Sequence, residues 1–438
     1  MSQRRGRVTV SRRTFLKAAA ATGGAAALGG IPGILRAGQA PAYAKGTKLH
    51  YLMQLHFIPA TDKVFMDQAA EFGKQMGVEV QVERIGQNDV PTRAAAAVEM
   101  KSGPDIIQIQ NNFPHLLADG AVDVGDVAEP IGKAQGGYYD LSKANAFSGG
   151  RWVAVPHDVL AWAWNYRESW LAEVGYNKFP ETWEQFRDMG KKLKAKGHPV
   201  GCAFGHSTND PNNYCYALTW CFGGMEVEKD GKTVILDKKG TLEALKLNTV
   251  MWKEAMDEGG LSWDDASNNR AFLAGSISVT GNSPSIYPVA RDKFPDVYQD
   301  MNHAPTPKGP AGRFYQLPTT SIMVMKHCKE QKLAKEFIRW FMAKERYEKW
   351  FDTADTFAIP PTKMWYDHPV WVRDRKNVVF RDVIKDARWP GFAGPASRNS
   401  SEAMAKYILV DMYAKAIQGT SPEEALKWAT AELKKIYA

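Results

Sequence analysis

The sequence predicts a protein of the α/β class, in which parallel strands are covered by helices. Strand-like and helix-like segments alternate between residues 48 and 110, in the order strand, helix, strand, helix, strand. This order is typical of a parallel sheet with helices packed on its faces. A hydrophobic fraction of 44% is sufficient for real cores, and the length of 438 residues indicates more than one domain.

The first five elements follow from periodicity and end signals. The apolar residues of the first helix recur at three- and four-residue spacing, whereas the second strand alternates Val with Glu and Gln. Gly77 suits the left-handed conformation that ends a helix. We therefore expect strands at 48–55, 78–85 and 105–110, and helices at 60–76 and 90–101.

The remaining elements carry similar signals. Thr182 and Gln185 have the spacing of a capping box, and Ser421, Pro422 and Glu424 suit the N-cap, first and third positions of a helix. Apolar spacing predicts the other segments. We expect strands at 151–155, 200–204, 277–280 and 315–325, and helices at 166–174, 183–196, 214–221, 242–258, 268–274, 332–351, 401–417 and from 421 onward.

Residues 1–44 have the composition of an export signal. Ser11-Arg12-Arg13-Thr14-Phe15-Leu16-Lys17 closely resembles the bacterial twin-arginine signal, and an Ala/Gly-rich stretch runs from there to an A-x-A-like site at residues 42–44. The alternative of an ordinary helix is disfavoured by the many glycines. An uncleaved N-terminal anchor is the minor alternative. We expect cleavage and a periplasmic protein of residues 45–438.

The basic charge belongs to this leader. The chain carries a net charge of +8, residues 1–44 hold six Arg, one Lys and no acidic residue, and the remainder is therefore +1. No later Lys/Arg block of the kind that grips phosphate is present, so we expect no nucleic-acid partner. No later segment reaches the roughly 18 uninterrupted apolar residues of a membrane span.

The sequence contains few motifs for chemistry. We find no G-x-S-x-G, H-E-x-x-H, G-x-x-x-x-G-K-[ST] or C-x-x-C motif, and therefore expect no enzyme, cofactor or metal. The cysteines at 202, 215, 221 and 328 lack zinc spacing. A disulfide of Cys202 with Cys215 or Cys221, or buried free thiols, are both compatible with the sequence.

Aromatic residues are abundant, with 14 Trp, 16 Tyr and 19 Phe. Several lie in expected loops beside Asn, Asp or His. Sugar rings present an apolar C–H face and a rim of hydroxyls, which suits an aromatic platform flanked by side chains that donate and accept hydrogen bonds. For any single Trp, packing in the core is the competing role.

Several segments, in order, resemble the extracellular solute-binding proteins of ABC importers, specifically the maltose-binding-like family 1. The most specific match is Asn165-Tyr166 with Leu171 to Gly175 and then Phe179-Pro180-Glu181-Thr182-Trp183-Glu184-Gln185-Phe186. The other matching segments are 102–107, 150–156, 272–275, 280–281, 332–350 and 421–426. Neither a lipobox cysteine nor an ordinary secretory signal is present, unlike in many relatives.

The resemblance implies a two-lobed periplasmic binding protein fold of type II, each lobe a mostly parallel sheet flanked by helices. We expect residues 45–157 and 304–352 in the N-terminal lobe, and 158–303 and 353–438 in the C-terminal lobe. The crossings are expected near 155–160, 303–312 and 351–361. Ligand would bind in the cleft and close the lobes by hinge motion.

The resemblance also places the ligand site at loops that follow strands. The candidates are polar or aromatic residues of these loops: His56, Phe57, Asn111, Asn112, His157, Asp158, Trp162, Asn209, Asp210, Trp220, Asn282, Tyr315, Asp355, Trp389 and Arg398.

The expected function is capture of a mono- or oligosaccharide or a polyol and its delivery to the transmembrane permease subunits of an ABC importer. We expect a monomer. The alternative within the same fold is a charged small molecule, such as a sugar phosphate, sulfonate or polyamine. An exported carbohydrate-active enzyme is the third possibility.

Overall fold

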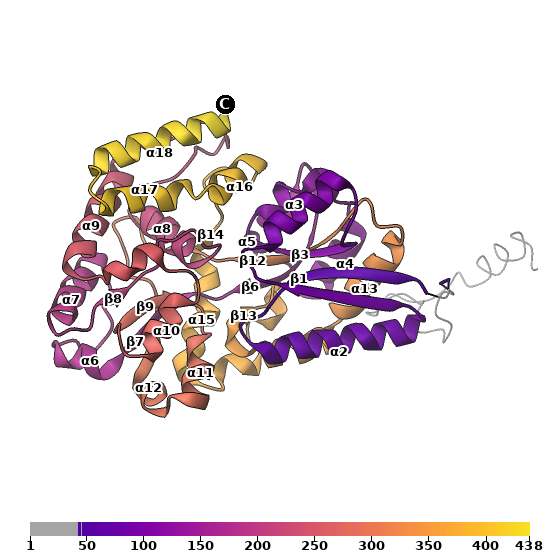
Figure 1. Ribbon diagram of the computed structural model, residues 1–438, viewed down its shortest axis with the longest axis horizontal. Helices are drawn as coiled ribbons and strands as arrows, with labels where there is room; N and C mark the ends of the chain where they lie inside the picture. The colour runs from indigo at the N-terminus through magenta and orange to yellow at the C-terminus, as the bar shows by residue number, and fades with distance from the viewer. Residues whose placement is uncertain (1–42, 45) are drawn as a thin grey trace, which may run out of the picture. The chain divides into compact units, whose positions relative to one another are not determined.

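The computed structural model describes residues 43, 44 and 46–438, and all of the expected leader except its last two residues lies outside this range. Two sheets organise the described chain. In Figure 1, β1 and β3 lie together with α2, α3 and α13, and β7, β8 and β9 lie together with α6, α7 and α10. Among the described residues, no helix has the length and apolar character needed to cross a bilayer.

The larger sheet is built from six strands. Its spatial order is β13 (Ala358–Ile359), β6 (Val155–Leu160), β12 (Thr319–Val324), β3 (Ile106–Gln110), β1 (Lys48–Gln54) and β2 (Glu79–Ile85). The neighbours β1–β2 and β1–β3 are parallel, whereas β12 is antiparallel to both β3 and β6. The expected two-lobed α/β fold is confirmed, but this sheet is mixed rather than mostly parallel, because β12 and β13 enter it from long returning connections.

The first elements have nearly the expected bounds. Helix α2 (Pro59–Met76) ends at Gly77, whose φ of 69° is the left-handed conformation that glycine tolerates best. Helix α3 (Val90–Met100) returns the chain to β3. The remaining elements of this lobe are α4 (Gly125–Ala134), α5 (Asp140–Ala146), β4 (Phe147–Ser148), β5 (Arg151–Trp152), α13 (Gln331–Phe341) and α14 (Lys344–Ala354).

The smaller sheet has the order β10 (Met301–Ala304), β7 (Ala163–Arg167), β9 (Val279–Asn282) and β8 (Val200–Gly201). Only β8 and β9 are parallel, so this sheet is also mixed. Its helices are α6 (Glu168–Glu173), α7 (Trp183–Ala195), α8 (Asp210–Cys221), α9 (Lys239–Glu254), α10 (Ser267–Leu273), α11 (Ile286–Lys293), α12 (Pro295–Asp300), α15 (Val378–Asp382), α16 (Arg398–Ala405), α17 (Ile408–Ile417) and α18 (Pro422–Tyr437).

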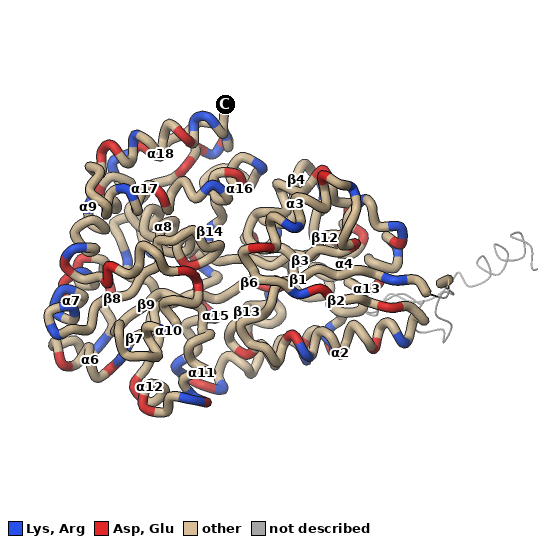
Figure 2. The backbone as a smooth tube through the Cα atoms, viewed as in Figure 1, with Lys and Arg blue, Asp and Glu red and all other residues tan. Residues whose placement is uncertain are grey.

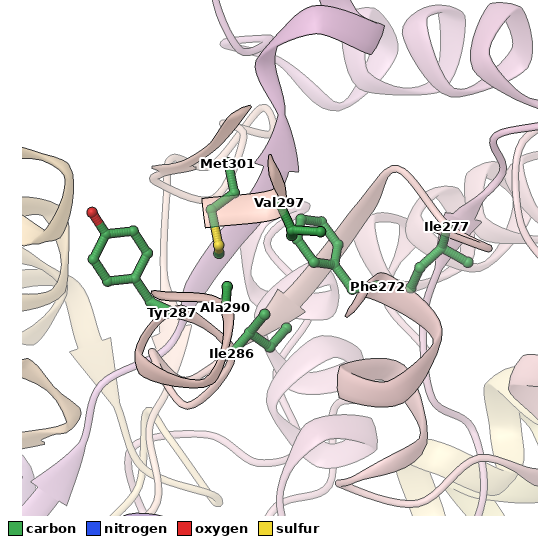
Figure 3. Packing of buried hydrophobic residues seen from close by; sticks show 7 residues of the cluster. All are labelled: Phe272, Ile277, Ile286, Tyr287, Ala290, Val297 and Met301. Atoms are coloured by element: carbon green, nitrogen blue, oxygen red, sulfur yellow. The ribbon is translucent and has the colours of Figure 1, made fainter. Parts of the chain in front are cut away.

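Several apolar side chains form a core around α10, α11 and α12. Phe272, Ile277, Ile286 and Met301 are fully buried there (Figure 3). Their burial removes apolar surface from water and fixes α11 against the smaller sheet. This core therefore holds the start of α11 at the edge of the interlobe seam described below.

The predicted caps are confirmed. Thr182 accepts a hydrogen bond from the Gln185 backbone N–H at 3.3 Å, and the Gln185 side chain accepts from the Thr182 backbone N–H at 3.3 Å. Ser421 caps α18 with Pro422 at its first position. Charges of both signs are interspersed along α2, α7 and α18 (Figure 2), as expected when the leader carries most of the net positive charge.

Three expected elements are divided in the structure. The helix expected at 332–351 becomes α13 and α14, because Ala343 adopts an extended conformation between them. The helix expected at 401–417 breaks at Tyr407, which has a φ of 55° and stacks its ring on His206 at 4.4 Å. The strand expected at 315–325 is divided into β11 (Tyr315–Gln316) and β12. In each case tertiary packing overrides local periodicity.

The chain passes between the two sheets through residues 161–162 and residues 305–318. A third connection leaves the larger sheet after β13 and leads to β14 (Ala387–Arg388), which belongs to neither sheet. Strand β14 pairs in parallel with β11 of the second connection. The lobe boundaries expected at 157/158, 303/304 and 352/353 stay a prediction. Strand pairing assigns each strand to a sheet, but it does not say at which single residue one lobe ends and the other begins.

Candidate functional site

Two hollows lie along the seam between the lobes. The first, here called the polar hollow, has a volume of about 300 Å³ and is lined by Leu55, His56, Phe57, Gln87, Asn88, Asp264, Asp265 and Ala266. The second, here called the aromatic hollow, has a volume of about 340 Å³. Its walls come from residues 57–60 and 353–357 on one side and from residues 284–293 on the other, with Asn377. Phe57 lines both hollows, so they adjoin.

The loop after β2 joins the lobes through direct hydrogen bonds. The Asn88 side-chain oxygen accepts from the Thr208 hydroxyl at 2.6 Å and from the Thr208 backbone N–H at 3.1 Å. The neighbouring Gln87 accepts from the Asn209 side chain at 3.2 Å and donates to the Asp265 carboxylate. The two walls of the polar hollow are therefore joined by hydrogen bonds of the Gln87 and Asn88 side-chain amides.

Asp265 organises the start of α8. Its carboxylate accepts from the Ser207 hydroxyl at 2.6 Å, from the Asp210 backbone N–H at 2.8 Å and from the Asn209 backbone N–H at 3.2 Å. The two backbone donors lie at the N-cap and at the first position of α8, where N–H groups lack intrahelical partners. Burial raises the pKa of Asp265, and the donated hydrogen bonds oppose that shift.

Asp210 is a buried carboxylate in the same region. It accepts from the Trp162 indole N–H at 3.2 Å and from the Asn268 amide at 2.9 Å. Desolvation and then the neighbouring Asp265 raise its pKa well above the usual range. Trp162 is itself buried, and the ring lies so close to Gly281 that a β-carbon there would meet it at 2.1 Å. Asp210 thus positions the tryptophan of the first crossing.

Several buried side-chain amides lie along the seam where β3, β11 and α8 come together. Asn111 donates to the Thr208 carbonyl at 3.5 Å and accepts from Gln316 at 3.1 Å, and Asn212 donates to the same carbonyl at 3.2 Å. Gln110 lies opposite Thr320 in the sheet. Polar atoms without a hydrogen-bond partner among the described residues are present on Asn209, Gln110, Asn212, Asn213, Gln316 and Thr320. We call this set, with Asn111, the amide cluster.

His56 and Phe57 lie where the sequence predicted them, in the loop after β1. The His56 ring nitrogen Nδ1 accepts from the Ile58 backbone N–H at 2.9 Å, and Nε2 is buried without a partner in the described chain. Burial lowers the pKa of His56 to about 4, so the imidazole is uncharged near neutral pH. The Phe57 ring lies 6.1 Å from that of Phe357.

His157 and Asp158 lie on β6 of the larger sheet. Their side chains are 2.6 Å apart, and both are buried. The His157 ring packs against Trp350, whose ring centroid lies 4.4 Å away. Asp158 lines a small enclosed space together with His56. The structure therefore places His157 in the core of the lobe and Asp158 behind the polar hollow.

Other predicted site residues have structural partners away from the two hollows. The Tyr315 hydroxyl accepts from the Thr306 backbone N–H at 3.1 Å, and the Trp389 indole donates to the Gly394 carbonyl at 2.9 Å. Trp220 is fully buried against Tyr216. Asn282 donates to Asn269. None of Trp220, Asn282, Tyr315 and Trp389 is among the lining residues of either hollow.

Asn112 and Arg398 join the lobes at the rim near α16. Asn112 donates to the Ser400 hydroxyl at 3.3 Å, and Arg398 donates to the Leu116 carbonyl at 3.3 Å. The Arg398 side chain is 60% exposed and lies 3.5 Å from Asp119. Its charge therefore faces solvent beside a carboxylate.

Sequence patterns within single loops did not indicate Gln87, Asn88, Asp265, Gln316 or Asn377 as site residues. Gln87 and Asn88 follow a predicted strand end, which is the signal that could have found them. The other three depend on tertiary contacts between segments far apart in the sequence. Asp355 does line the aromatic hollow, as part of residues 353–357.

A family model of bacterial extracellular solute-binding proteins matches residues 67–378, which is more than half of the chain. The chain belongs to this family. A second match identifies a twin-arginine translocation signal at residues 9–29. This solute-binding protein is therefore exported to the periplasm through the twin-arginine pathway.

A relative from Deinococcus radiodurans, named as a probable ABC transporter-binding protein, is 23% identical over 257 residues. This alignment spans 57% of the chain and 60% of the relative's length. Its name describes a binding protein, as the description of the family does.

Solved structures resemble this solute-binding protein in fold. Maltose-bound T. maritima MalE3 has a TM-score of 0.75 at 20% identity, over 89% of this chain and 100% of that one. A sugar transporter structure from Arthrobacter chlorophenolicus A6 with laminaribiose has a TM-score of 0.78 at 18% identity, over 89% and 99%. A solute-binding protein from Agrobacterium radiobacter K84 with ribitol has a TM-score of 0.71 at 19% identity, over 90% and 99%.

Proposed function

We propose that this protein captures a neutral sugar or polyol between its two lobes and delivers it to the permease subunits of an ABC importer. The observation that carries this proposal is the amide cluster at the seam between the lobes, whose Asn209 donates a hydrogen bond to Gln87 of the polar hollow. Gln110 is 5% exposed, and both its amide nitrogen and its oxygen lack partners in the described chain. Asn213 shares this property.

Unsatisfied amides favour a polyhydroxylated ligand for a physical reason. Leaving a buried donor or acceptor unpaired costs about 1–3 kcal/mol. An amide both donates and accepts, and so does a hydroxyl group. A ligand rich in hydroxyls would therefore satisfy several of these atoms at once without a charge on either side.

The charges around the polar hollow support a neutral ligand over an anion. Its lining includes two carboxylates, Asp264 and Asp265, and neither Lys nor Arg. Asp265 already accepts from three donors on the Ser207–Asp210 loop and from Gln87. A phosphate or sulfonate would need a desolvated cation, whereas Arg398 is exposed at the rim.

In this proposal, closure of the lobes around the ligand shifts a conformational equilibrium. The bonds of Asn88 to Thr208 and of Gln87 to Asn209 exist when the lobes are close together. A ligand that contacts both walls would add differential binding energy to this conformation. His56, Phe57, Asn111, Asn209 and the amide cluster would supply those contacts.

Calorimetry with one neutral panel and several charged panels tests the ligand class. We expect heat of binding from a panel of neutral sugars and polyols, and no heat from sugar phosphates, sulfonates or polyamines. Binding of only a charged panel would overturn the proposal. Product release from a bound sugar, followed by chromatography, would instead favour an exported carbohydrate-active enzyme.

The transport step has a separate test. Deletion of the gene should abolish uptake of the radiolabelled ligand found by calorimetry, and the wild-type gene should restore uptake. The matched variant is Gln110→Leu, which keeps the side-chain size and removes both hydrogen-bonding atoms. Unchanged uptake with this variant would argue against the amide cluster as the ligand site.

A further inference from the structure

The two hollows suggest the size of the ligand. We propose, on the basis of the proposed sugar-binding function, that the ligand spans both hollows and contains at least two linked sugar rings. Phe57 is the wall that the hollows share, so a molecule can extend from one into the other past its ring.

Volume is the first observation. The hollows measure about 300 and 340 Å³, each at the lower end of the range of small-molecule sites. Each has lining residues from both lobes. A ligand that occupied only one hollow would touch neither lobe in the other hollow, on the far side of Phe57.

The chemistry of the aromatic hollow is the second observation. Phe57, Tyr287 and Phe357 contribute rings, and Asp355 contributes a half-buried carboxylate. Aromatic faces suit the apolar C–H face of a sugar ring, and carboxylate oxygens accept from hydroxyls. This is a complete set of contacts for a second ring.

Asn377 is the third observation. It lines the aromatic hollow, its residue is 4% exposed, and its Oδ1 atom has no hydrogen-bond partner within the described chain. A hydroxyl donor on the ligand would satisfy this atom. In the polar hollow, on the other side of Phe57, the buried His56 Nε2 also has no partner among the described residues. Unmet hydrogen-bonding capacity therefore exists in both hollows.

Charge is balanced in the aromatic hollow. Arg291 and Asp292 form an ion pair at 2.9 Å, and Lys293 and Asp355 bring one further charge of each sign. The formal charge of the lining is therefore zero. This balance fits a second neutral ring better than a charged extension.

Matched ligand pairs test the proposal by calorimetry on the full exported protein. The probes are glucose with maltose, cellobiose and laminaribiose, xylose with xylobiose, and mannose with mannobiose. We expect at least one disaccharide to bind about tenfold or more tightly than its monosaccharide. Equal affinity of a monosaccharide and its disaccharides would overturn the two-ring proposal while leaving sugar binding intact. Silence of every mono- and disaccharide, together with silence of the polyols of the neutral panel, would overturn the proposed function itself.

Two variants locate the second ring. Asp355→Asn keeps the size of the side chain and removes its charge, and Asn377→Ala removes the buried acceptor. We expect each to weaken disaccharide binding about fivefold or more and to leave monosaccharide binding within about twofold. Equal losses for both ligands would contradict the proposal. Thermal unfolding verifies folding, and the exposed Asn177→Ala is the matched control.

Discussion

The Asn88 side-chain oxygen accepts two hydrogen bonds from Thr208, one from the hydroxyl at 2.6 Å and one from the backbone N–H at 3.1 Å. The two residues belong to different lobes and are 120 positions apart in the chain. Thr208 is buried and Asn88 is partly exposed to solvent. This contact fixes the distance between the loop after β2 and the start of α8.

Asn88→Ala should favour separation of the lobes. The loss of two partly exposed hydrogen bonds costs about 1–2 kcal/mol, so ligand affinity should fall about five- to thirtyfold. Small-angle X-ray scattering should give a larger radius of gyration than for the wild type without added ligand. Asn177→Ala, an exposed asparagine, should change neither quantity. An unchanged radius and affinity in Asn88→Ala would show that this contact does not hold the lobes together.

Glu226 should make stability depend on pH. Its buried carboxyl accepts from the Tyr216 hydroxyl at 3.0 Å and from the Gly391 backbone N–H, and desolvation raises its pKa to about 7. The folded state therefore retains a proton that the unfolded state releases between about pH 4.5 and 7. The contribution to stability is full below this window and is lost as the pH rises through it.

Urea unfolding of the wild type and Glu226→Gln from pH 4 to pH 8 measures this effect. The uncharged variant should gain relative stability as the pH rises, by about 3 kcal/mol at most. A difference between the two proteins that is constant over this range would mean that Glu226 does not titrate as described.

Gly281→Ala should destabilise the protein. A β-carbon at this position would lie 2.1 Å from the Trp162 ring, which is held by the Asp210 carboxylate. Overpacking of this kind costs about 1–3 kcal/mol. In urea unfolding, the double variant Gly281→Ala with Trp162→Phe should lose less stability than the sum of the two single variants, because the smaller ring leaves space. Strict additivity would indicate that the two residues are not in contact.

The four cysteines should remain thiols after export. All are buried and unpaired in the structure, and burial raises the pKa of each of Cys202, Cys215, Cys221 and Cys328. Ellman's reagent should react slowly with the native protein and detect four thiols per chain in guanidinium without reductant. Detection of two thiols would instead reveal a disulfide, the alternative that the spacing left open.

The candidate site could be predicted only in part. His56, Phe57 and Asn111 follow strand ends, and strand ends are visible as changes of hydrophobic period. Trp220 and Tyr315 have the same composition signal, yet one packs in the core and the other bonds to Thr306. A sequence pattern cannot distinguish an aromatic ring that faces ligand from one that faces the core, because both are apolar with a polar edge.

The export signal, the order of strands and helices, the caps at Thr182 and Ser421, and the family could be read from the amino-acid sequence. These features depend on local composition and on spacing within about one turn or one strand. The breaks at Ala343 and Tyr407, the direction of β12, the free thiols, and the contacts of Asn88 and Asp265 across the seam became visible only in the folded chain. Those outcomes depend on which distant segments are brought together, and the energy of such contacts is not encoded in any one segment.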